Sequence, residues 1–132
     1  MVRVEKKYLG VDWGEKRIGL ALGDNETKLA TPYKTVKGID EILKVVKEEK
    51  IDVVVVGKPL KMSNIEYRIS DEFSDFLSLL KKELKIPVET ADERLSSKAA
   101  DALPGNKKEK SGRDEIAAMV ILQSYLDRHN RY

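Results

Sequence analysis

The sequence predicts an α/β fold: one domain over residues 1–132, built on a mixed five-stranded sheet that is flanked by helices. Three observations predict it. Short β-prone segments separated by turn residues fill the first quarter of the chain, amphipathic helices and strands then alternate, and one strand is almost continuously β-branched. Three antiparallel strands that are continued by two parallel strands, through helical crossovers, satisfy this order.

The first three strands are expected to form an antiparallel unit. Lys7 to Trp13 is short, apolar and β-prone, and a glycine turn separates it from the second strand, Arg17 to Gly23. Asp24-Asn25 is typical of the next turn. Leu29 to Val36 is the third strand, and Pro32 confines it to an edge of the sheet because proline cannot donate a ladder hydrogen bond.

A helix and a buried strand follow this unit. Between Asp40 and Lys50, apolar residues recur at helical spacing with Lys and Glu between them, which predicts an amphipathic helix. Ile51 to Val56 is almost continuously β-branched, as in a strand that is covered on both faces of a parallel sheet. Gly57-Lys58-Pro59 ends this strand, which we expect at the centre of the sheet.

The next segments predict a helix, a strand and a short helix. After a loop through Ser63-Asn64, a second amphipathic helix carries the apolar stripe Ile69, Phe73, Phe76, Leu77, Leu80 and Leu84. Pro87 to Ala91 is the last strand, and Ser96-Ser97 caps a short helix that ends at Leu103.

A loop and a helix complete the predicted fold. Pro104 to Arg113 is rich in Gly, Lys and Asn, which predicts a mobile surface loop. Ile116 to Leu126 predicts the final helix, with Ala117, Val120, Ile121 and Tyr125 facing inward.

Composition and charge narrow the class of protein. Hydrophobic residues make up 41% of the chain and charged residues 36%, which is the balance of a globular protein rather than of a disordered tail. The absence of Cys fits a reducing compartment and excludes disulfides, thiol catalysis and Cys-ligated zinc. The longest aliphatic run, Val53 to Val56, is far too short to span a bilayer, and no signal peptide is predicted, so we expect a cytoplasmic protein. The net charge of +2 permits nucleic-acid binding without requiring it.

Three carboxylates lie at the ends of predicted elements. Asp12 ends the first strand, Glu93 follows the last strand, and Asp114 begins the final helix. Ligands of such sheets collect at the carboxyl ends of the strands, so folding is expected to bring these side chains together. Clustered carboxylates repel one another unless a cation is bound, and oxygen ligands favour Mg²⁺ or Mn²⁺. Two such ions can activate a water and stabilise both oxygens of an in-line phosphoryl displacement.

Each carboxylate taken singly also has a structural interpretation. Asp12 is typical of a residue that opens a turn. Asp92-Glu93 can stabilise the start of the next helix or pair with Arg94, and whether Asp92 shares the site is left open. Asp114 can lie in the first turn of a helix that Ser111 caps. The convergence of the three favours the metal site, whereas the lone His129, next to the C-terminus, is a poor candidate for a ligand or base.

The basic residues fall into two sets. Lys44, Lys47, Lys81 and Lys82 lie on the amphipathic helices and are expected to form a solvated face. The second set lies in loops or element starts at or near the proposed site, where it can neutralise backbone phosphates; ordinary surface solubility is the alternative. This set comprises Lys16, Arg17, Lys58, Lys61, Arg94, Lys107, Lys108, Lys110 and Arg113.

Four ordered blocks carry a family resemblance over nearly the whole chain. They are Gly10-Val11-Asp12-Trp13-Gly14 with Lys16-Arg17-Ile18-Gly19 and Ala21; Val56-Gly57-Lys58-Pro59-Leu60 with Met62; Asp92-Glu93-Arg94-Leu95-Ser96-Ser97; and Asp114 with Ala117-Ala118 and Ile121 to Asp127. In these blocks the chain resembles the YqgF family of pre-16S rRNA nucleases, relatives of the RuvC-type Holliday junction resolvases. Three departures are mild: Lys58 replaces the usual Leu, Asn64 stands near a common Gly, and Ser96-Ser97 replaces a common Thr pair.

The resemblance implies a ribonuclease H-like fold, a divalent-metal nuclease site and a role in maturing the 5′ end of 16S rRNA. It implies that Asp12, Glu93 and Asp114 are the acidic triad. RuvC-like enzymes carry a carboxylate at the end of the central parallel strand, where this chain has Gly57. If the last strand lies two places from the first, roughly 10 Å away, Glu93 must reach over the strand between them, and Gly57 leaves it room.

Several functions remain open at this point. Branched DNA is an alternative substrate to precursor rRNA, because no reader of the 2′-hydroxyl can be identified. A non-catalytic RNA-binding module of ribosome assembly is a second class. An ATP-using enzyme of the actin and sugar-kinase type is a third, because Asp12-x-Gly14 before a hairpin resembles its phosphate loop, but one domain of this length offers only half a cleft. We expect a monomer or a weak homodimer.

Overall fold

Five strands form one mixed sheet in the computed structural model, which describes residues 5–14, 16–58, 65–92 and 110–129. The strands are β1 (Lys7–Asp12), β2 (Ile18–Asp24), β3 (Ala30–Val36), β4 (Val53–Lys58) and β5 (Val88–Asp92), in the spatial order β3-β2-β1-β4-β5. β1 pairs antiparallel with β2 and parallel with β4, β2 pairs antiparallel with β3, and β4 pairs parallel with β5. The predicted mixed sheet is confirmed, with β3 at an edge as Pro32 indicated. The strand expected at the centre, β4, is interior but not central; β1 is the middle strand, because burial on both faces marks any interior strand and not the middle one alone.

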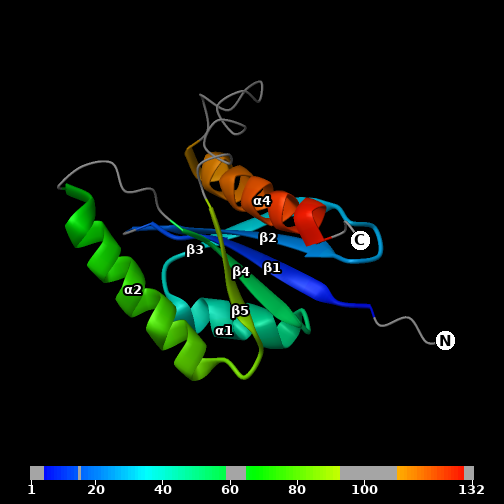
Figure 1. The fold of residues 1–132 in the computed structure, drawn as a ribbon, viewed down its shortest axis with the longest axis horizontal. Coiled ribbons are helices and arrows are strands. Elements are labelled where there is room, and N and C mark those ends of the chain that lie inside the picture. Colours follow the sequence, from blue (N-terminus) through cyan, green and yellow to red (C-terminus); the bar gives the residue numbers. More distant parts are fainter. Residues whose placement is uncertain (1–4, 15, 59–64, 93–109, 130–132) are drawn as a thin grey trace.

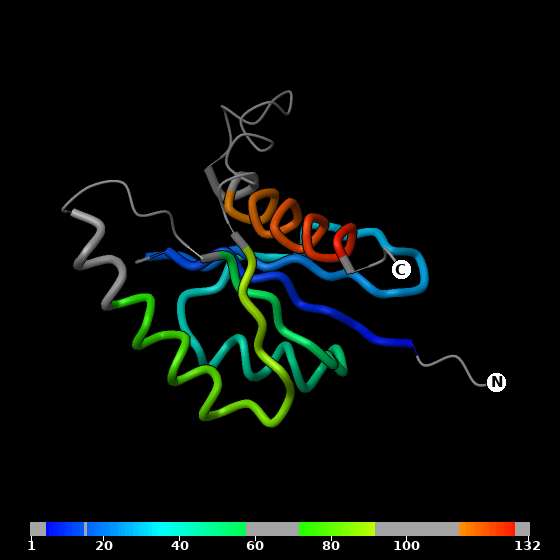
Figure 2. The backbone as a smooth tube through the Cα atoms, in the orientation of Figure 1, coloured from blue at the N-terminus to red at the C-terminus, as the bar shows by residue number. Residues whose placement is uncertain are grey.

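Helices cover both faces of this sheet. Helices α1 (Ile39–Glu48) and α2 (Ile65–Glu83) lie on one face, and α4 (Lys110–His129) lies alone on the other among the described helices (Figure 1). The tube view shows the same two layers on either side of the strands (Figure 2). Among the described helices, none combines the length and the apolar character that a bilayer crossing requires.

The face toward α1 and α2 carries the larger hydrophobic core. Side chains alternate along a strand, so Leu9 and Val11 of β1 point to this face together with Val54 and Val56 of β4. The helices contribute Ile42, Val45, Phe73, Phe76 and Leu80, all buried. The predicted stripe of α2 is therefore confirmed for Phe73, Phe76 and Leu80, with Leu77 and Leu84 partly buried against the core; the side chain of Ile69 lies outside the described residues.

Three glycines on the face toward α4 allow the helix to approach the strands closely. A Cβ added to Gly10 would lie 2.8 Å from the carbonyl oxygen of Ala118, and one added to Gly19 would overlap the carbonyl group of Asp114. A Cβ on Gly23 would lie 3.1 Å from side-chain atoms of Leu122 and Leu126. We call Gly10, Gly19 and Gly23 the glycine seam. Because helix residues four apart share a face, the seam meets α4 at Asp114, Ala118, Leu122 and Leu126.

Helix α4 begins earlier than the sequence predicted. We expected Ile116 to Leu126, but the helix spans Lys110–His129, so the prediction of a loop is wrong for residues 110–113. Residues 104–109, and the predicted short helix from Ser96-Ser97 to Leu103, lie outside the described residues. Residues 110–113 carry no apolar side chain, so they give no hydrophobic periodicity from which a helix could be predicted. The backbone hydrogen bonds of the helix do not require apolar side chains.

The inward face of α4 also differs from the prediction. Ile121 is buried as expected, but the other buried positions are Ala118, Leu122 and Leu126, whereas Ala117, Val120 and Tyr125 are only partly buried. Every residue from 116 to 122 is apolar, so the sequence pattern does not select a face. The glycine seam selects it, because only one side of the helix can approach the backbone of β1 and β2 this closely.

The other end of α4 is tied to the connection between β2 and β3. Gln123 accepts a hydrogen bond from the backbone N–H of Ala30 at 2.9 Å and donates one to the carbonyl oxygen of Lys28 at 2.9 Å. It also donates to Oδ1 of Asp127 at 3.1 Å. The helix is therefore held at both ends, by hydrogen bonds near Gln123 and by close packing near Asp114.

Candidate functional site

The fold brings Asp12 and Asp114 to the same end of the same sheet face. Asp12 is the last residue of β1, and its register partner on β2 is Gly19. Alternation along β1 places Asp12 on the face of Gly10, which is the face that α4 covers. The backbone of Asp114 lies directly on Gly19. Two carboxylates that are far apart in the chain are thus neighbours across one pair of strands.

Asp114 is held against a single cation of the described residues. The Nε atom of Arg17 lies 3.2 Å from Oδ2 of Asp114, and the two side chains are 45% and 26% exposed, respectively. Oδ2 itself is buried, and within the described part of the chain no donor forms a hydrogen bond to it, because the N–H of Arg17 is close but not aligned with it. A buried acceptor without a hydrogen bond costs about 1–3 kcal/mol. This oxygen is therefore suited to a cation.

The capping role that the sequence left open for Asp114 is excluded. Helix α4 begins at Lys110, so Asp114 lies in its second turn and not in a first turn capped by Ser111. The prediction that Asp114 begins the helix is wrong for the same reason as the predicted loop. The backbone of Asp114 nevertheless lies on Gly19 of β2, beside the end of β1.

The position of Gly57 agrees with the geometry that the resemblance implied. β5 lies two places from β1, with β4 between them. Val11 pairs with Val56, so Asp12 and the buried Gly57 follow one step along the two parallel strands. Gly57 in turn pairs with Ala91, which is buried on the α4 face. β5 ends at Asp92, and Glu93 lies just outside the described residues.

Glu115 and Thr35 are polar residues beside the site that the sequence analysis did not consider. Thr35 Oγ1 donates a hydrogen bond to Oε2 of Glu115 at 3.2 Å, and Thr35 is the register partner of Gly19 on β3. Glu115 therefore points toward the edge strand, on the side of Gly19 away from Asp12. The proximity of Glu115 to Asp114 in the sequence was the one available signal, and the hydrogen bond assigns it to anchoring α4.

Some of the basic residues that were predicted to contact nucleic acid lie within the described residues, and the others lie outside them. Lys16 and Arg17 are exposed and follow the end of β1. Lys58 ends β4 at the same edge of the sheet, while Lys110 and Arg113 belong to the start of α4 rather than to a loop. Lys61, Arg94, Lys107 and Lys108 lie outside the described residues.

The candidate metal ligands of the described chain are Asp12 and Asp114. No cluster of three or more acidic or histidine side chains occurs within residues 5–14, 16–58, 65–92 and 110–129. The third predicted ligand, Glu93, lies outside those ranges. The chemistry of the set, carboxylate oxygens alone, fits Mg²⁺ or Mn²⁺.

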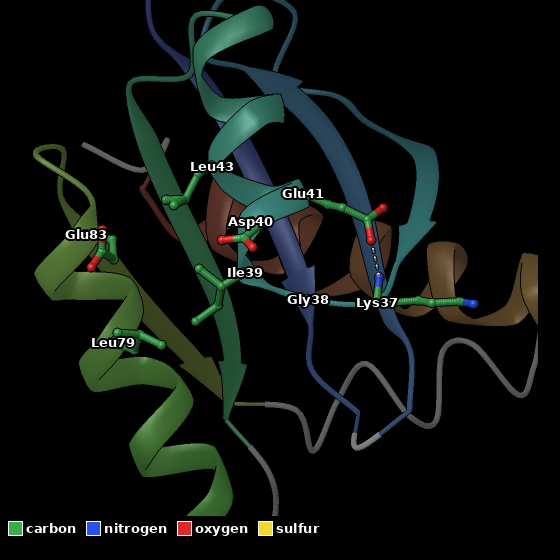
Figure 3. Close-up of a pocket in the computed structure, with 8 residues that line it drawn as sticks. All are labelled: Lys37, Gly38, Ile39, Asp40, Glu41, Leu43, Leu79 and Glu83. Carbon is green, nitrogen blue, oxygen red and sulfur yellow. Dashed lines mark hydrogen bonds between the residues drawn. The ribbon is translucent and has the colours of Figure 1, made fainter.

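Two other features of the structure, a pair of tyrosines and a surface hollow, lie away from this site. Burial raises the pKa of Tyr8 and of Tyr125, whose ring centroids lie 5.8 Å apart beneath α4, at the opposite end of β1 from Asp12. A hollow of about 520 Å³ lies between the start of α1 and the end of α2, where Ile39 and Leu43 face Leu79 and the carboxylate of Glu83 lies at the rim (Figure 3). These helices cover the face opposite α4, so the hollow does not reach Asp114.

Sequence comparisons place the chain among nuclease-like proteins. The family model described as RuvX, Holliday junction resolvase, matches residues 6–128. Relatives in Natranaerobius thermophilus, Chloroflexus aggregans and Shewanella oneidensis each bear the name "Putative pre-16S rRNA nuclease". The first is 36% identical over 92% of this chain and 94% of its own, the second 38% over 93% and 94%, and the third 36% over 94% and 96%.

Solved structures share the fold. RuvC of Thermus thermophilus, in complex with a Holliday junction substrate, superposes with a TM-score of 0.62 at 15% identity and covers 95% of this chain and 96% of its own. The fowlpox virus resolvase in complex with Holliday junction DNA gives 0.55 at 14% identity, covering 95% and 99%. The expected ribonuclease H-like architecture of the RuvC type is confirmed.

Proposed function

The chain belongs to the RuvX family of Holliday junction resolvases, and from this membership we propose that it is a metal-dependent nuclease that matures the 5′ end of pre-16S rRNA. The observation that carries the proposal is that Asp12, the register partner of Gly19, and Asp114, which packs on Gly19, lie at the same end of one sheet face, with a buried oxygen of Asp114 that lacks a hydrogen bond among the described residues. The names of the relatives support precursor rRNA as the proposed substrate. A protein with this role would act in the cytoplasm, where we propose that it is located.

Each of the three carboxylates has a proposed role in binding the metal ion or in orienting the attacking water. Asp12 is fixed by the central strand of the sheet, and Asp114 by the packing of α4 on Gly19, so both present oxygen ligands from rigid elements. Glu93, which follows β5, is the third ligand or the base that orients the attacking water. Held by these carboxylates, Mg²⁺ or Mn²⁺ would supply Lewis-acid activation of a water and positive charge beside the phosphate.

Basic residues around the site neutralise the RNA backbone. Lys16 and Arg17 are exposed beside the end of β1, and Lys58 ends β4 at the same edge. We assign the same role to Lys61, Arg94, Lys107, Lys108, Lys110 and Arg113. Phosphate contacts of this kind position a nucleic acid without reading its sequence. The protein acts as a monomer or a weak homodimer.

Cleavage of precursor rRNA by the purified chain tests the proposal. We expect cleavage with Mg²⁺ or Mn²⁺, none with a chelator, and a loss of at least about a hundredfold in Asp12→Asn and Asp114→Asn, because each removes a ligand charge. Glu115→Gln is the matched control, since it removes the adjacent carboxylate of α4, and its rate should stay within about threefold of wild type. Equal loss in Glu115→Gln would contradict the assignment of Asp114.

A four-way DNA junction is the second substrate to test in the same assay. The fold neighbours were solved with junction DNA, and the chemistry of backbone cleavage is the same for both nucleic acids. Faster cleavage of the junction than of precursor rRNA would favour this alternative. If wild type and Asp12→Asn bind RNA equally and neither cleaves with either metal, the chain is a binding module of ribosome assembly.

A further inference from the structure

Arg17 lies against a carboxylate that the proposed function assigns to metal binding. Its Nε atom is 3.2 Å from the buried Oδ2 of Asp114, and no other ion pair to Asp114 forms among the described residues. We propose that Arg17 is the counter-ion of Asp114 while the metal site is empty, and that it turns to a substrate phosphate once Asp114 ligates a divalent cation. The inference rests on the proposed function and adds a positioning residue to it.

The contact between Arg17 and Asp114 balances the carboxylate charge, and it can also be broken. A carboxylate oxygen that is buried without a hydrogen bond needs a nearby positive charge, and Arg17 supplies one by proximity rather than through an aligned N–H. The guanidinium side chain is 45% exposed, so it can leave Asp114 without opening the core. An ion pair of this exposure shifts a competing equilibrium by a factor of about five at most.

The backbone of Arg17 is fixed even though its side chain is exposed. A Cβ added to Gly14 would lie 2.6 Å from the carbonyl oxygen of Arg17, so the turn between β1 and β2 is closed tightly there. The next residue, Ile18, starts β2 and is buried. The side chain therefore extends from a fixed backbone position that lies next to Asp114 and to the end of β1.

A phosphate is the chemical partner that fits Arg17 after release. The planar guanidinium binds phosphate oxygens through two parallel hydrogen bonds, a geometry that lysine cannot reproduce. While the Asp114 charge is unshared, it competes with the phosphate for Arg17. When that charge is shared with a metal ion the competition ends, so the metal and the nucleic acid favour each other's binding through this one side chain.

Calorimetric titration with Mn²⁺ in the absence of nucleic acid tests the competition directly. We expect Arg17→Ala to bind Mn²⁺ about two- to fivefold more tightly than wild type, because the metal no longer displaces a paired cation. Lys16→Ala is the matched control: it removes the neighbouring positive charge without the contact, and its affinity should match wild type. Arg17→Gln, which keeps most of the side-chain volume, should behave as Arg17→Ala, and circular dichroism checks that each variant is folded.

The second measurement separates the two roles of Arg17. With saturating metal, Arg17→Ala and Arg17→Lys should each raise KM for precursor rRNA about three- to tenfold, with kcat within about threefold of wild type. In the titration, Arg17→Lys should stay near wild type because the charge beside Asp114 is kept.

The outcomes distinguish this inference from the proposed function. Unchanged or weaker Mn²⁺ binding in folded Arg17→Ala and Arg17→Gln overturns the inference, whatever the enzyme cleaves. Tighter binding in a protein whose wild type cleaves neither substrate supports the inference and removes the proposed function. A wild type that binds no Mn²⁺ overturns both.

Discussion

Gly19 determines how closely Asp114 approaches Asp12. Its hydrogen atom occupies the place where any other residue would carry a Cβ, and that Cβ would overlap the carbonyl group of Asp114. The neighbour is backbone within a helix, so no change of rotamer can relieve the overlap. A single glycine thus brings the start of α4 against β2, and with it a carboxylate toward the end of β1.

Gly19→Ala should therefore damage the site more than the fold. We expect α4 to lift at Asp114, a loss of about 1–3 kcal/mol in the free energy of unfolding, and at least about a tenfold loss of cleavage. Urea denaturation and the cleavage assay measure the two effects. Gly23→Ala is the matched control at the other end of the glycine seam, where the close atoms include the flexible ends of Leu122 and Leu126. Comparable loss of activity in both variants would refute a special role for Gly19.

Asp24 makes a pH-dependent contribution to stability. The backbone N–H of Thr27 donates a hydrogen bond to Oδ1 of Asp24 at 2.7 Å, that of Glu26 donates another at 2.9 Å, and these bonds hold the pKa of the carboxyl below its ordinary value of 3.8. A lowered folded pKa means that the stabilisation is present above about pH 4 and is lost as the pH falls through the folded value.

Asp24→Asn should remove most of this pH dependence. Urea denaturation at about pH 6 should show the variant about 0.5–1 kcal/mol less stable than wild type, because a charged acceptor is replaced by a neutral one. The difference should shrink as the pH falls below about 4, because Asp24 then begins to lose its charge. A difference that persists undiminished at acidic pH would show that the carboxylate charge is not responsible.

At the level of elements, the sequence predicted the sheet better than the last helix. Each strand lies within a few residues of its prediction, because β-branched runs bounded by Gly and Pro are unambiguous locally. Helix α4 is longer than predicted, and its buried face is displaced by one residue from the predicted face, although Ile121 is buried as expected. Residues 110–113 carry no apolar side chain, and residues 116–122 are all apolar, so neither segment defines the helix or its face. Its face is chosen by glycines on other strands, which is information that its own sequence does not contain.

Because β4 lies between β1 and β5, a substitution at Gly57 tests whether Glu93 reaches Asp12 and Asp114 across β4. A Leu side chain there would fill the space between Asp12 and Ala91 on the α4 face. We expect Gly57→Leu to fold, at a cost of about 1–3 kcal/mol, and to lose metal-dependent cleavage, because the Leu side chain would fill the space over β4 that the proposed ligand Glu93 needs. Circular dichroism establishes folding, and wild-type activity in the folded variant would refute this geometry.

At the scale of the whole molecule, the two faces of the sheet have different tasks. The α1 and α2 face holds most of the large buried side chains, while the α4 face holds the candidate site. The sequence predicted Asp12 and Asp114 for one site because it placed both at the ends of expected elements, although Asp114 lies in the second turn of α4. It could not predict the Arg17 contact or the Thr35 hydrogen bond to Glu115, since each joins a strand region to a helix across a packing distance that only the glycine seam sets.

Metal binding should raise the free energy of unfolding of the whole domain, because the ion would bind the folded state, in which Asp114 of α4 and Asp12 of β1 lie at the same end of the sheet. At Mn²⁺ concentrations of about a hundred times Kd, the gain is about 2.7 kcal/mol, which corresponds to a rise in Tm of roughly 5–15 °C for a domain of this size. Differential scanning fluorimetry or calorimetry measures the shift. Asp12→Asn should abolish it, and a full shift in that variant would place the metal elsewhere.

The single tryptophan of the chain reports on only one of these layers. Trp13 packs edge-on against Phe73, with ring centroids 5.8 Å apart, and belongs to the core beneath α1 and α2. The contact between Tyr8 and Tyr125 belongs to the opposite layer and depends on the docking of α4. In mild denaturant, undocking of α4 would separate Asp12 from Asp114 while the indole fluorescence stayed native, so catalysis would fade before the usual optical signal of unfolding moved.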